Sequence, residues 1–183
     1  MAQFTVPILA DVTDSDARQT LEGIQSKLGM LPNLYAFEAH APQAFLSNLA
    51  FAQALESGSF SNRQVQAIYL AVSEVNDCSY CLSAHTALAK MNGFSEEETF
   101  DLRTGTIADP MLRTLTQLTR SFVETKGRPD AALLDAFFAA GFDQTAFVEL
   151  VGLISVKTLS NYIHNAAQFP VDFPLAKPVP VLV

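Results

Sequence analysis

Tryptophan is absent from this chain, cysteine occurs twice, and the eleven lysines and arginines are outnumbered by nineteen aspartates and glutamates. The net charge of −8, with the basic residues scattered, disfavours binding to nucleic acid or to an anionic membrane surface. No basic segment followed by an apolar one opens the chain, and charged residues or glycine interrupt each apolar stretch before the roughly 20 residues of a membrane span. We therefore expect a cytoplasmic protein without nucleic-acid or membrane partners.

The scarcity of cysteine also excludes a disulfide framework, because both cysteines fall within one four-residue window. Secreted domains instead use spaced cysteines to join distant loops. With 49% hydrophobic residues, the 183-residue chain can bury a core without such crosslinks. We expect a single domain over residues 1–183, in which the cysteine pair is reactive or binds a metal.

Helix start and stop signals repeat along the chain, whereas no convincing pair of strands is present. Serine followed by Gln or Glu three residues later forms capping boxes, and proline or aspartate marks other helix starts. The expected helices begin near Asp14, Pro42, Ser61, Asp77, Ser95, Asp109, Pro129 and Asp143. The last pattern predicts one helix or two. We therefore predict an all-α bundle of about seven to nine helices.

The end of the chain has a different composition. Four prolines occur from about residue 170 onward, among apolar residues. Proline cannot continue a helix and favours extended backbone. We expect this tail to lie extended over the domain or over a neighbouring subunit.

The chemically informative segment contains Cys78, Cys81 and His85, which share one face if the segment is helical. With Asp77 as N-cap, Cys78 would lie in the first helical turn, where the helix dipole favours thiolate over thiol. His85 would then accept the proton of Cys81 or, once protonated, pair with its thiolate. The pattern predicts a nucleophilic thiol whose partner cysteine closes a disulfide after oxidation.

Other interpretations of the pair remain open. Buried cysteines can be inert packing residues. A zinc site would need a fourth ligand from His40, His164 or a carboxylate far away in the sequence. Covalent haem attachment is excluded because Leu82, rather than histidine, follows the second cysteine. We expect neither a cofactor nor a metal.

The residues from Ser61 to Thr86, SNRQVQAIYLAVSEVNDCSYCLSAHT, resemble the signature of the alkylhydroperoxidase D-like (AhpD-like) branch of the carboxymuconolactone decarboxylase superfamily. Looser similarities to its peroxidase-related members occur at 28–34, at Asn161-Tyr162 and at 170–172. The resemblance implies an AhpD-like helical bundle that assembles as a homo-oligomer, a trimer or a hexamer. It also implies that Cys81 is the peroxidatic cysteine, Cys78 the resolving cysteine and His85 part of a proton relay.

One position departs from the family pattern. The relay glutamate that the family usually places a dozen residues before the first cysteine is replaced here by Gln66, which cannot take up a proton. Glu74, four residues before Cys78, is a candidate substitute, although a solvated carboxylate at a helix end is an equally good interpretation. Tyr80 and His164 are further candidates, with packing or surface roles as their alternatives.

By this resemblance we expect a thiol-dependent peroxidase that reduces hydroperoxides through a dithiol/disulfide cycle and takes electrons from a thiol or dithiol reductant. The same residues would also serve a dithiol-disulfide shuttle or a redox sensor for a protein partner. Two other classes are a lyase of the decarboxylase type, whose family members generally lack the paired cysteines, and a structural zinc protein.

Overall fold

The helices of this computed structural model, which describes residues 4–180, begin and end close to the predicted signals. No strand occurs over these residues. The helices are α1 (Ser15–Leu28), α2 (Asn33–Glu38), α3 (Pro42–Glu56), α4 (Asn62–Val75), α5 (Ser79–Met91), α6 (Glu96–Thr104), α7 (Pro110–Glu124), α8 (Ala131–Ala139) and α9 (Gln144–Ala167), preceded by a 3₁₀ turn at Leu9–Asp11. The predicted all-α class is therefore confirmed.

Side-chain caps explain most of these boundaries. Asp14 accepts hydrogen bonds from the backbone N–H groups of Asp16 and Ala17 at the start of α1. Ser61 and Ser95 form complete capping boxes at the starts of α4 and α6. These caps satisfy N–H groups that have no partner within the helix, which is why the local sequence predicts the helix starts so well.

The structure adds one helix to the sequence-based expectation and decides one point that it left open. Helix α2 was not predicted, because its six residues are too few for a periodic pattern and its N-cap, Pro32, has no side-chain hydrogen bond to offer. The last segment, predicted as one helix or two, is the single 24-residue helix α9. Both helices affect the functional site, since α2 and α9 contribute charged residues to it.

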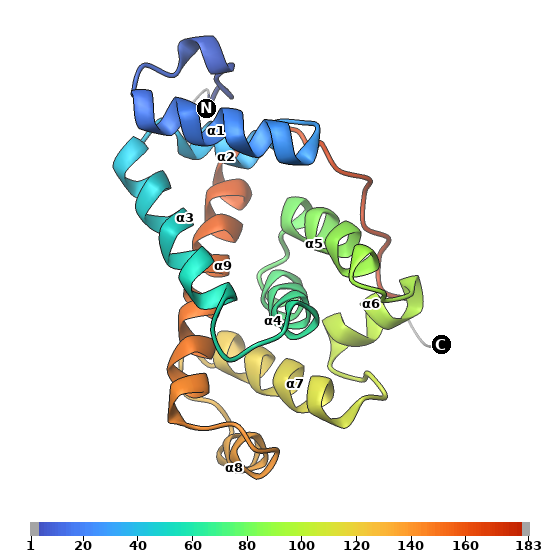
Figure 1. The fold of residues 1–183 in the computed structure, drawn as a ribbon. Helices are drawn as coiled ribbons and strands as arrows, with labels where there is room; N and C mark the ends of the chain where they lie inside the picture. The colour runs from blue at the N-terminus through green and yellow to red at the C-terminus, as the bar shows by residue number, and fades with distance from the viewer. Residues whose placement is uncertain (1–3, 181–183) are drawn as a thin grey trace.

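Helix α4 lies in the middle of the bundle, in contact with α5, α6, α7 and α9 (Figure 1). Its residues from Ala67 to Ser73 are all buried. One face contributes Ile68 and Val72 to the largest core cluster, together with Leu118 of α7 and Leu153 of α9. Helices α1, α2 and α3 gather around the C-terminal half of α9 (Figure 1). The cysteine-bearing α5 is thus held against the most deeply buried helix.

Helix α9 is long and apolar enough to cross a membrane by length and composition. This finding corrects the expectation that charged residues or glycine interrupt every such stretch of the sequence. In the structure α9 packs against α3, α4 and α5, and it buries Lys157, Asn161 and His164. These buried polar side chains are available to an internal site, so α9 can contribute to that site as a core helix.

The C-terminal tail crosses the bundle as extended chain, as predicted, up to residue 180; residues 181–183 lie outside the described part. Figure 1 shows it running from the end of α9 past α5 to α6. The backbone N–H of Ala176 donates to Ser83 Oγ at 3.1 Å, and Arg103 Nη1 donates to the carbonyl of Lys177 at 2.7 Å. The Asn33 N–H donates to Asp172 Oδ2 at 2.6 Å. These bonds fasten the tail across α2, α5 and α6.

Candidate active site

The turn between α4 and α5 places both cysteines at the N-terminal end of α5. After α4 ends, Asp77 adopts a left-handed conformation with φ of 50°, and the N–H of Cys78 donates to the carbonyl of Ser73 at 3.0 Å. Cys78, rather than Asp77, is therefore the N-cap of α5. The predicted cap was wrong by one residue, because Asp77 serves the end of α4 and does not start the next helix.

As N-cap, the Cys78 sulfur accepts a hydrogen bond from the backbone N–H of Cys81 at 3.4 Å. Both cysteines are free thiols, and their residues are 0% and 1% exposed. The hydrogen bond from the Cys78 thiol, helped by the charge of Lys157, lowers the pKa of Cys81 to about 7, while the same interaction raises the pKa of Cys78. The pair therefore holds one thiolate, on Cys81, near neutral pH.

His85 lies one turn beyond Cys81, and Gln66 fixes its orientation. His85 Nδ1 and Gln66 Oε1 are 2.8 Å apart, and because an amide oxygen only accepts, Nδ1 carries the proton. Burial, and then repulsion from Lys157, lowers the pKa of His85 well below its usual range. The ring is consequently neutral with Nε2 unprotonated, which favours the predicted role of proton acceptor over that of an ion-pair partner.

Lys157 of α9 was not singled out from the sequence. The residue is only 7% exposed, and its ammonium group lies 4.3 Å from the centroid of the Tyr69 ring, in cation–π geometry. Its charge acts on both Cys81 and His85. Lysine in the apolar middle of a helix was the available signal, since such a side chain is rarely buried without a partner.

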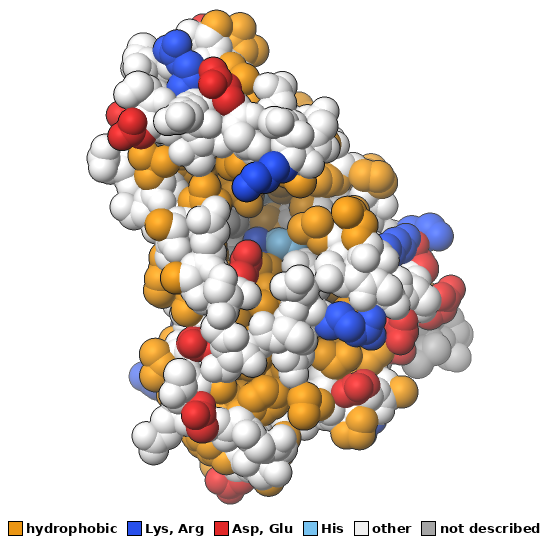
Figure 2. Space-filling view, in the orientation of Figure 1, with side chains coloured by type: hydrophobic (Ala, Val, Ile, Leu, Met, Phe, Trp, Pro, Cys, Tyr) orange, Lys and Arg blue, Asp and Glu red, His pale blue; other side chains and the backbone are white. Residues whose placement is uncertain are grey.

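Two neighbouring cavities meet at His85 and Lys157. The first, here called the thiol cavity, has a volume of about 190 Å³ and is lined by Cys81, His85, Lys157 and largely apolar side chains, including Phe173 of the tail. The second, the polar cavity, has about 320 Å³ and adds Glu38 and Gln66 to its lining. Figure 2 shows a hollow on this face where acidic, basic and histidine side chains come together. A small organic molecule in the thiol cavity would lie against Cys81 and His85.

His164 and Tyr80 approach the site from the side of Cys78. His164 Nδ1 lies 3.9 Å from the Cys78 sulfur, and His164 Nε2 lies 3.1 Å from the carbonyl of Phe169. With Nε2 donating to this carbonyl, Nδ1 faces Cys78 as an acceptor. The Tyr80 hydroxyl accepts from the N–H of Leu34 at 3.2 Å, and its ring packs beside His164 with centroids 5.2 Å apart. His164 thus reaches the thiols, whereas Tyr80 ties α5 to α2.

The remaining candidates have structural partners. Glu74 pairs with Arg103 at 2.7 Å, and Arg103 in turn holds the tail, so the Glu74 carboxylate is engaged away from the thiol chemistry. His40 Nε2 lies 2.9 Å from the carbonyl of Thr5. Over residues 4–180, no group of three or more His, Cys, Asp and Glu side chains is arranged to hold a metal ion.

Comparisons with known proteins identify a family pattern in the sequence and similar folds among solved structures. Residues 41–111, which include Gln66, both cysteines and His85, match the sequence model of the carboxymuconolactone decarboxylase family. The curated proteins gave no match. An AhpD core structure, a peroxidase-related protein from Ralstonia eutropha JMP134, superposes with a TM-score of 0.80 at 24% identity, over 90% of this chain and 88% of that one.

Two further solved structures have similar folds. A peroxidase-related protein from Silicibacter sp. TM1040 gives a TM-score of 0.75 at 19% identity, covering 94% of this chain and 91% of its own. A debrominase in complex with a tribromopyrrole gives 0.79 at 15% identity, with 94% and 92% covered. Such identities establish the fold and leave the reaction open. The resemblance expected from the sequence is thereby confirmed: the chain has the AhpD-like fold, and its residues 41–111 carry the pattern of the carboxymuconolactone decarboxylase family.

Proposed function

We propose that this chain is a thiol-dependent peroxidase in which Cys81 reduces an organic hydroperoxide and Cys78 then forms a disulfide with it. The observation that carries this proposal is Cys81 in the lining of the thiol cavity, with the pKa of its thiol lowered to about 7 by Cys78 and Lys157. A thiolate is the reactive form of cysteine, so the lowered pKa makes Cys81 the more reactive of the two thiols near neutral pH.

In the first step, the Cys81 thiolate attacks the terminal oxygen of the hydroperoxide. An S–O bond forms while the O–O bond breaks, so that Cys81 is oxidised by two electrons to a sulfenic acid. The alkoxide leaves and takes up a proton to become an alcohol. His85, neutral and hydrogen-bonded to Gln66, borders the same cavity and is placed to carry this proton.

In the second step, the Cys78 sulfur attacks the Cys81 sulfur, and hydroxide leaves as water with the proton of Cys78. The thiolate that raised the pKa of Cys78 no longer exists at this stage, and His164 Nδ1, 3.9 Å from the Cys78 sulfur, is placed to accept its proton. A separate thiol or dithiol reductant then restores both thiols.

The walls of the thiol cavity favour organic hydroperoxides over hydrogen peroxide. Leu28, Leu34, Leu88 and Phe173 line it beside Cys81. Burying the alkyl or aryl group of a substrate against such side chains contributes about 25 cal/mol per Å² of apolar surface. Because both cysteines are buried, a small hydroperoxide also reaches Cys81 more readily than a protein disulfide does.

The test is rapid-mixing oxidation of the reduced protein by cumene hydroperoxide and hydrogen peroxide, with mass spectrometry of the products. We expect loss of two hydrogens in the wild type, a trappable sulfenic acid in Cys78→Ser, and at least a thousand-fold slower reaction in Cys81→Ser. Full turnover by Cys81→Ser would refute the mechanism. If neither oxidant reacts but the protein exchanges rapidly with small disulfides, the shuttle hypothesis replaces the peroxidase.

A further inference from the structure

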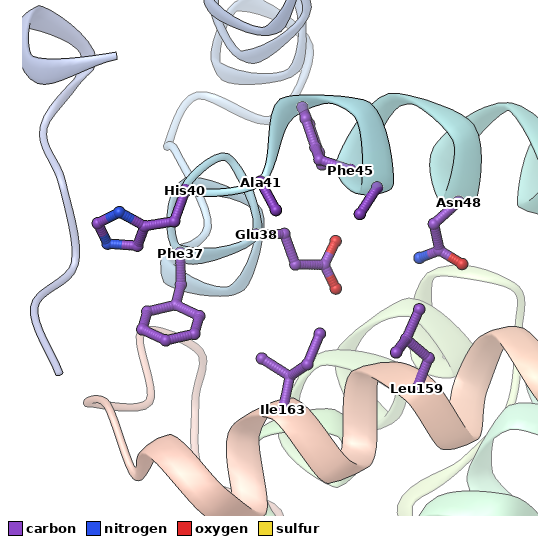
Figure 3. A pocket seen from close by; sticks show the side chains of 9 residues that line it. Phe37, Glu38, His40, Ala41, Phe45, Asn48, Leu159 and Ile163 are labelled. Carbon is purple, nitrogen blue, oxygen red and sulfur yellow. The ribbon is translucent and has the colours of Figure 1, made fainter. Parts of the chain in front are cut away.

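Glu38, the last residue of α2, has a buried carboxylate without a partner. The residue is 8% exposed, and within residues 4–180 neither of its carboxylate oxygens has a hydrogen-bond partner. Buried polar groups are nearly always hydrogen-bonded, so this carboxylate requires an explanation. Figure 3 shows it pointing from α2 into a cavity of about 180 Å³, between Phe45 of α3 and Ile163 of α9.

Glu38 also lies between this cavity, here called the outer cavity, and the interior of the site. The outer cavity reaches the surface, since Ala41 and Ala44 on its rim are exposed and Leu159 is 45% exposed. On its other side, Glu38 lines the polar cavity together with His85. The 320 Å³ of the polar cavity provides room for several water molecules at roughly 30 Å³ each.

The proposed chemistry both releases and consumes a proton. Forming the Cys81 thiolate releases a proton, and the departing alkoxide requires one. His85 holds a second proton poorly because burial lowers its pKa, and Gln66 cannot hold one at all. Burial raises the pKa of Tyr35 to about 12 and also raises that of Tyr69, so neither phenol exchanges protons readily near neutral pH.

Titratable groups on the helices packed around Glu38 influence the pKa of its carboxyl group. Burial is the largest influence and raises the Glu38 pKa to about 7, Lys157 opposes it, and the Cys81 thiolate adds to it. The titratable groups around the outer, polar and thiol cavities, besides the two tyrosines named above, are Glu56 of α3, Tyr80, Cys81 and His85 of α5, Lys157 of α9 and His40 at the outer rim. Glu56 is engaged by the Tyr69 hydroxyl at 2.9 Å, which leaves Glu38 as the carboxylate without a bond.

We propose that Glu38 is the proton reservoir of the thiol site: it takes up the proton released when Cys81 ionises and returns it, through water in the polar cavity and His85, to the alkoxide leaving group. This inference rests on the proposed peroxidase function. Glu38 touches neither the sulfur nor the hydroperoxide in this scheme, and it acts through the groups between them. The reactive state combines the Cys81 thiolate with a protonated Glu38.

The decisive variant is Glu38→Gln, with Glu56→Gln as the matched control from the same cavity. Two measurements are made across pH: the rate of Cys81 oxidation by cumene hydroperoxide, and thiolate formation from iodoacetamide alkylation of Cys81. Removing the negative charge of Glu38 lowers the Cys81 pKa, so thiolate formation moves to lower pH. A purely electrostatic role would therefore speed up oxidation, whereas the reservoir predicts that oxidation becomes about ten-fold slower or more.

The pH profile provides a second criterion. We expect a bell-shaped oxidation profile for the wild type, rising as Cys81 ionises and falling as Glu38 loses its proton, and the alkaline fall should disappear in Glu38→Gln. Glu38→Asp should restore part of the rate, and Glu56→Gln should keep the wild-type profile. Oxidation by Glu38→Gln that is unchanged or faster overturns the reservoir.

The two proposals fail in different ways. If the wild type reduces no hydroperoxide, the peroxidase function is refuted whatever Glu38 does. In that event alkylation still tests whether Glu38 and Cys81 are coupled: a shift of thiolate formation in Glu38→Gln, absent in Glu56→Gln, retains the electrostatic coupling that proton exchange between them requires. Identical alkylation profiles in all three proteins overturn it.

Discussion

The thiol end of α5 and the charged cluster between α2 and α9 border the same cavities, but they arise from the sequence in different ways. Cys78, Cys81 and His85 are neighbours along one helix, so their spacing alone brings them together. Glu38 and Lys157 come from helices far apart in the chain and meet only through packing. The local motif provides the nucleophile. The residues brought together by packing influence the pKa of that nucleophile and, in our proposal, exchange protons with it.

Among the substitutions not yet described, the largest effect is expected from Lys157→Met, which tests whether the local motif is sufficient on its own. Methionine keeps most of the buried volume and removes the charge. Lys157 helps to lower the Cys81 pKa to about 7, so the variant's pKa rises and its thiolate forms at higher pH. We expect alkylation of Cys81 by iodoacetamide to be roughly five- to ten-fold slower at pH 7 and to approach the wild-type rate in alkaline buffer.

Lys90→Met is the matched control for this experiment, because Lys90 lies on α5 with an exposed side chain that pairs with Glu96. Its alkylation profile should equal that of the wild type. An unchanged alkylation profile in Lys157→Met would mean that the residues of α5 alone determine the pKa of Cys81. The contrast between the two regions would then be wrong.

An intermediate effect, on stability alone, is expected from Glu74→Gln. Glu74 is close to the thiols in sequence, but its partner in space is the buried Arg103, whose side chain is 5% exposed. Breaking this pair leaves a buried guanidinium with weaker partners, which should lower the free energy of unfolding by about 1–2 kcal/mol. Hydroperoxide reduction should stay within about two-fold of the wild-type rate.

Chemical denaturation and peroxidase assays on the same samples decide this point. Glu124→Gln, which breaks the more exposed pair between Glu124 and Arg120, provides the control and should change stability by less than about 0.5 kcal/mol. A Glu74→Gln variant that folds normally but reacts ten-fold more slowly would mean that Glu74 takes part in the reaction.

The smallest effect concerns the turn that positions the cysteines. Asp77 has a φ of 50°, a conformation that glycine adopts without strain. We expect Asp77→Gly to stabilise the protein by about 0.5–1 kcal/mol in thermal or chemical unfolding, with unchanged Cys81 alkylation. Lys126→Gly, at the left-handed residue after α7 with φ of 56°, should give a similar gain far from the site. Loss of stability in Asp77→Gly alone would assign the Asp77 side chain a role that its backbone does not explain.

The sequence predicted most of the fold because capping residues act locally. Asp14, Ser61 and Ser95 bond to N–H groups within a few residues, so their effect is independent of tertiary structure. Helix α2 has no such cap and is held by contacts such as the bond from the Asn33 N–H to Asp172. A six-residue helix that depends on residues far along the chain gives no local signal.

The same distinction applies to the site. The spacing of Cys78, Cys81 and His85 identified the thiols, and the contact between His85 and Gln66 lies where two neighbouring helices meet. The N-cap shifted to Cys78 because Asp77 was needed to end α4. A lysine in the apolar middle of a helix was a signal for Lys157, but neither Lys157 nor Glu38 could be assigned to the site, because burial gives both side chains their properties and depends on how α2 and α9 pack.

The lack of tryptophan has a practical consequence for studying this protein. Ultraviolet emission comes from four tyrosines, of which Tyr35, Tyr69 and Tyr80 line the two site cavities, while Tyr162 is 61% exposed. Tyrosine emission is quenched by nearby charged and sulfur-containing groups. The intrinsic fluorescence of the unlabelled chain should therefore report the redox and protonation state of the thiol site in real time, and Tyr162→Phe would remove the one contribution from outside it.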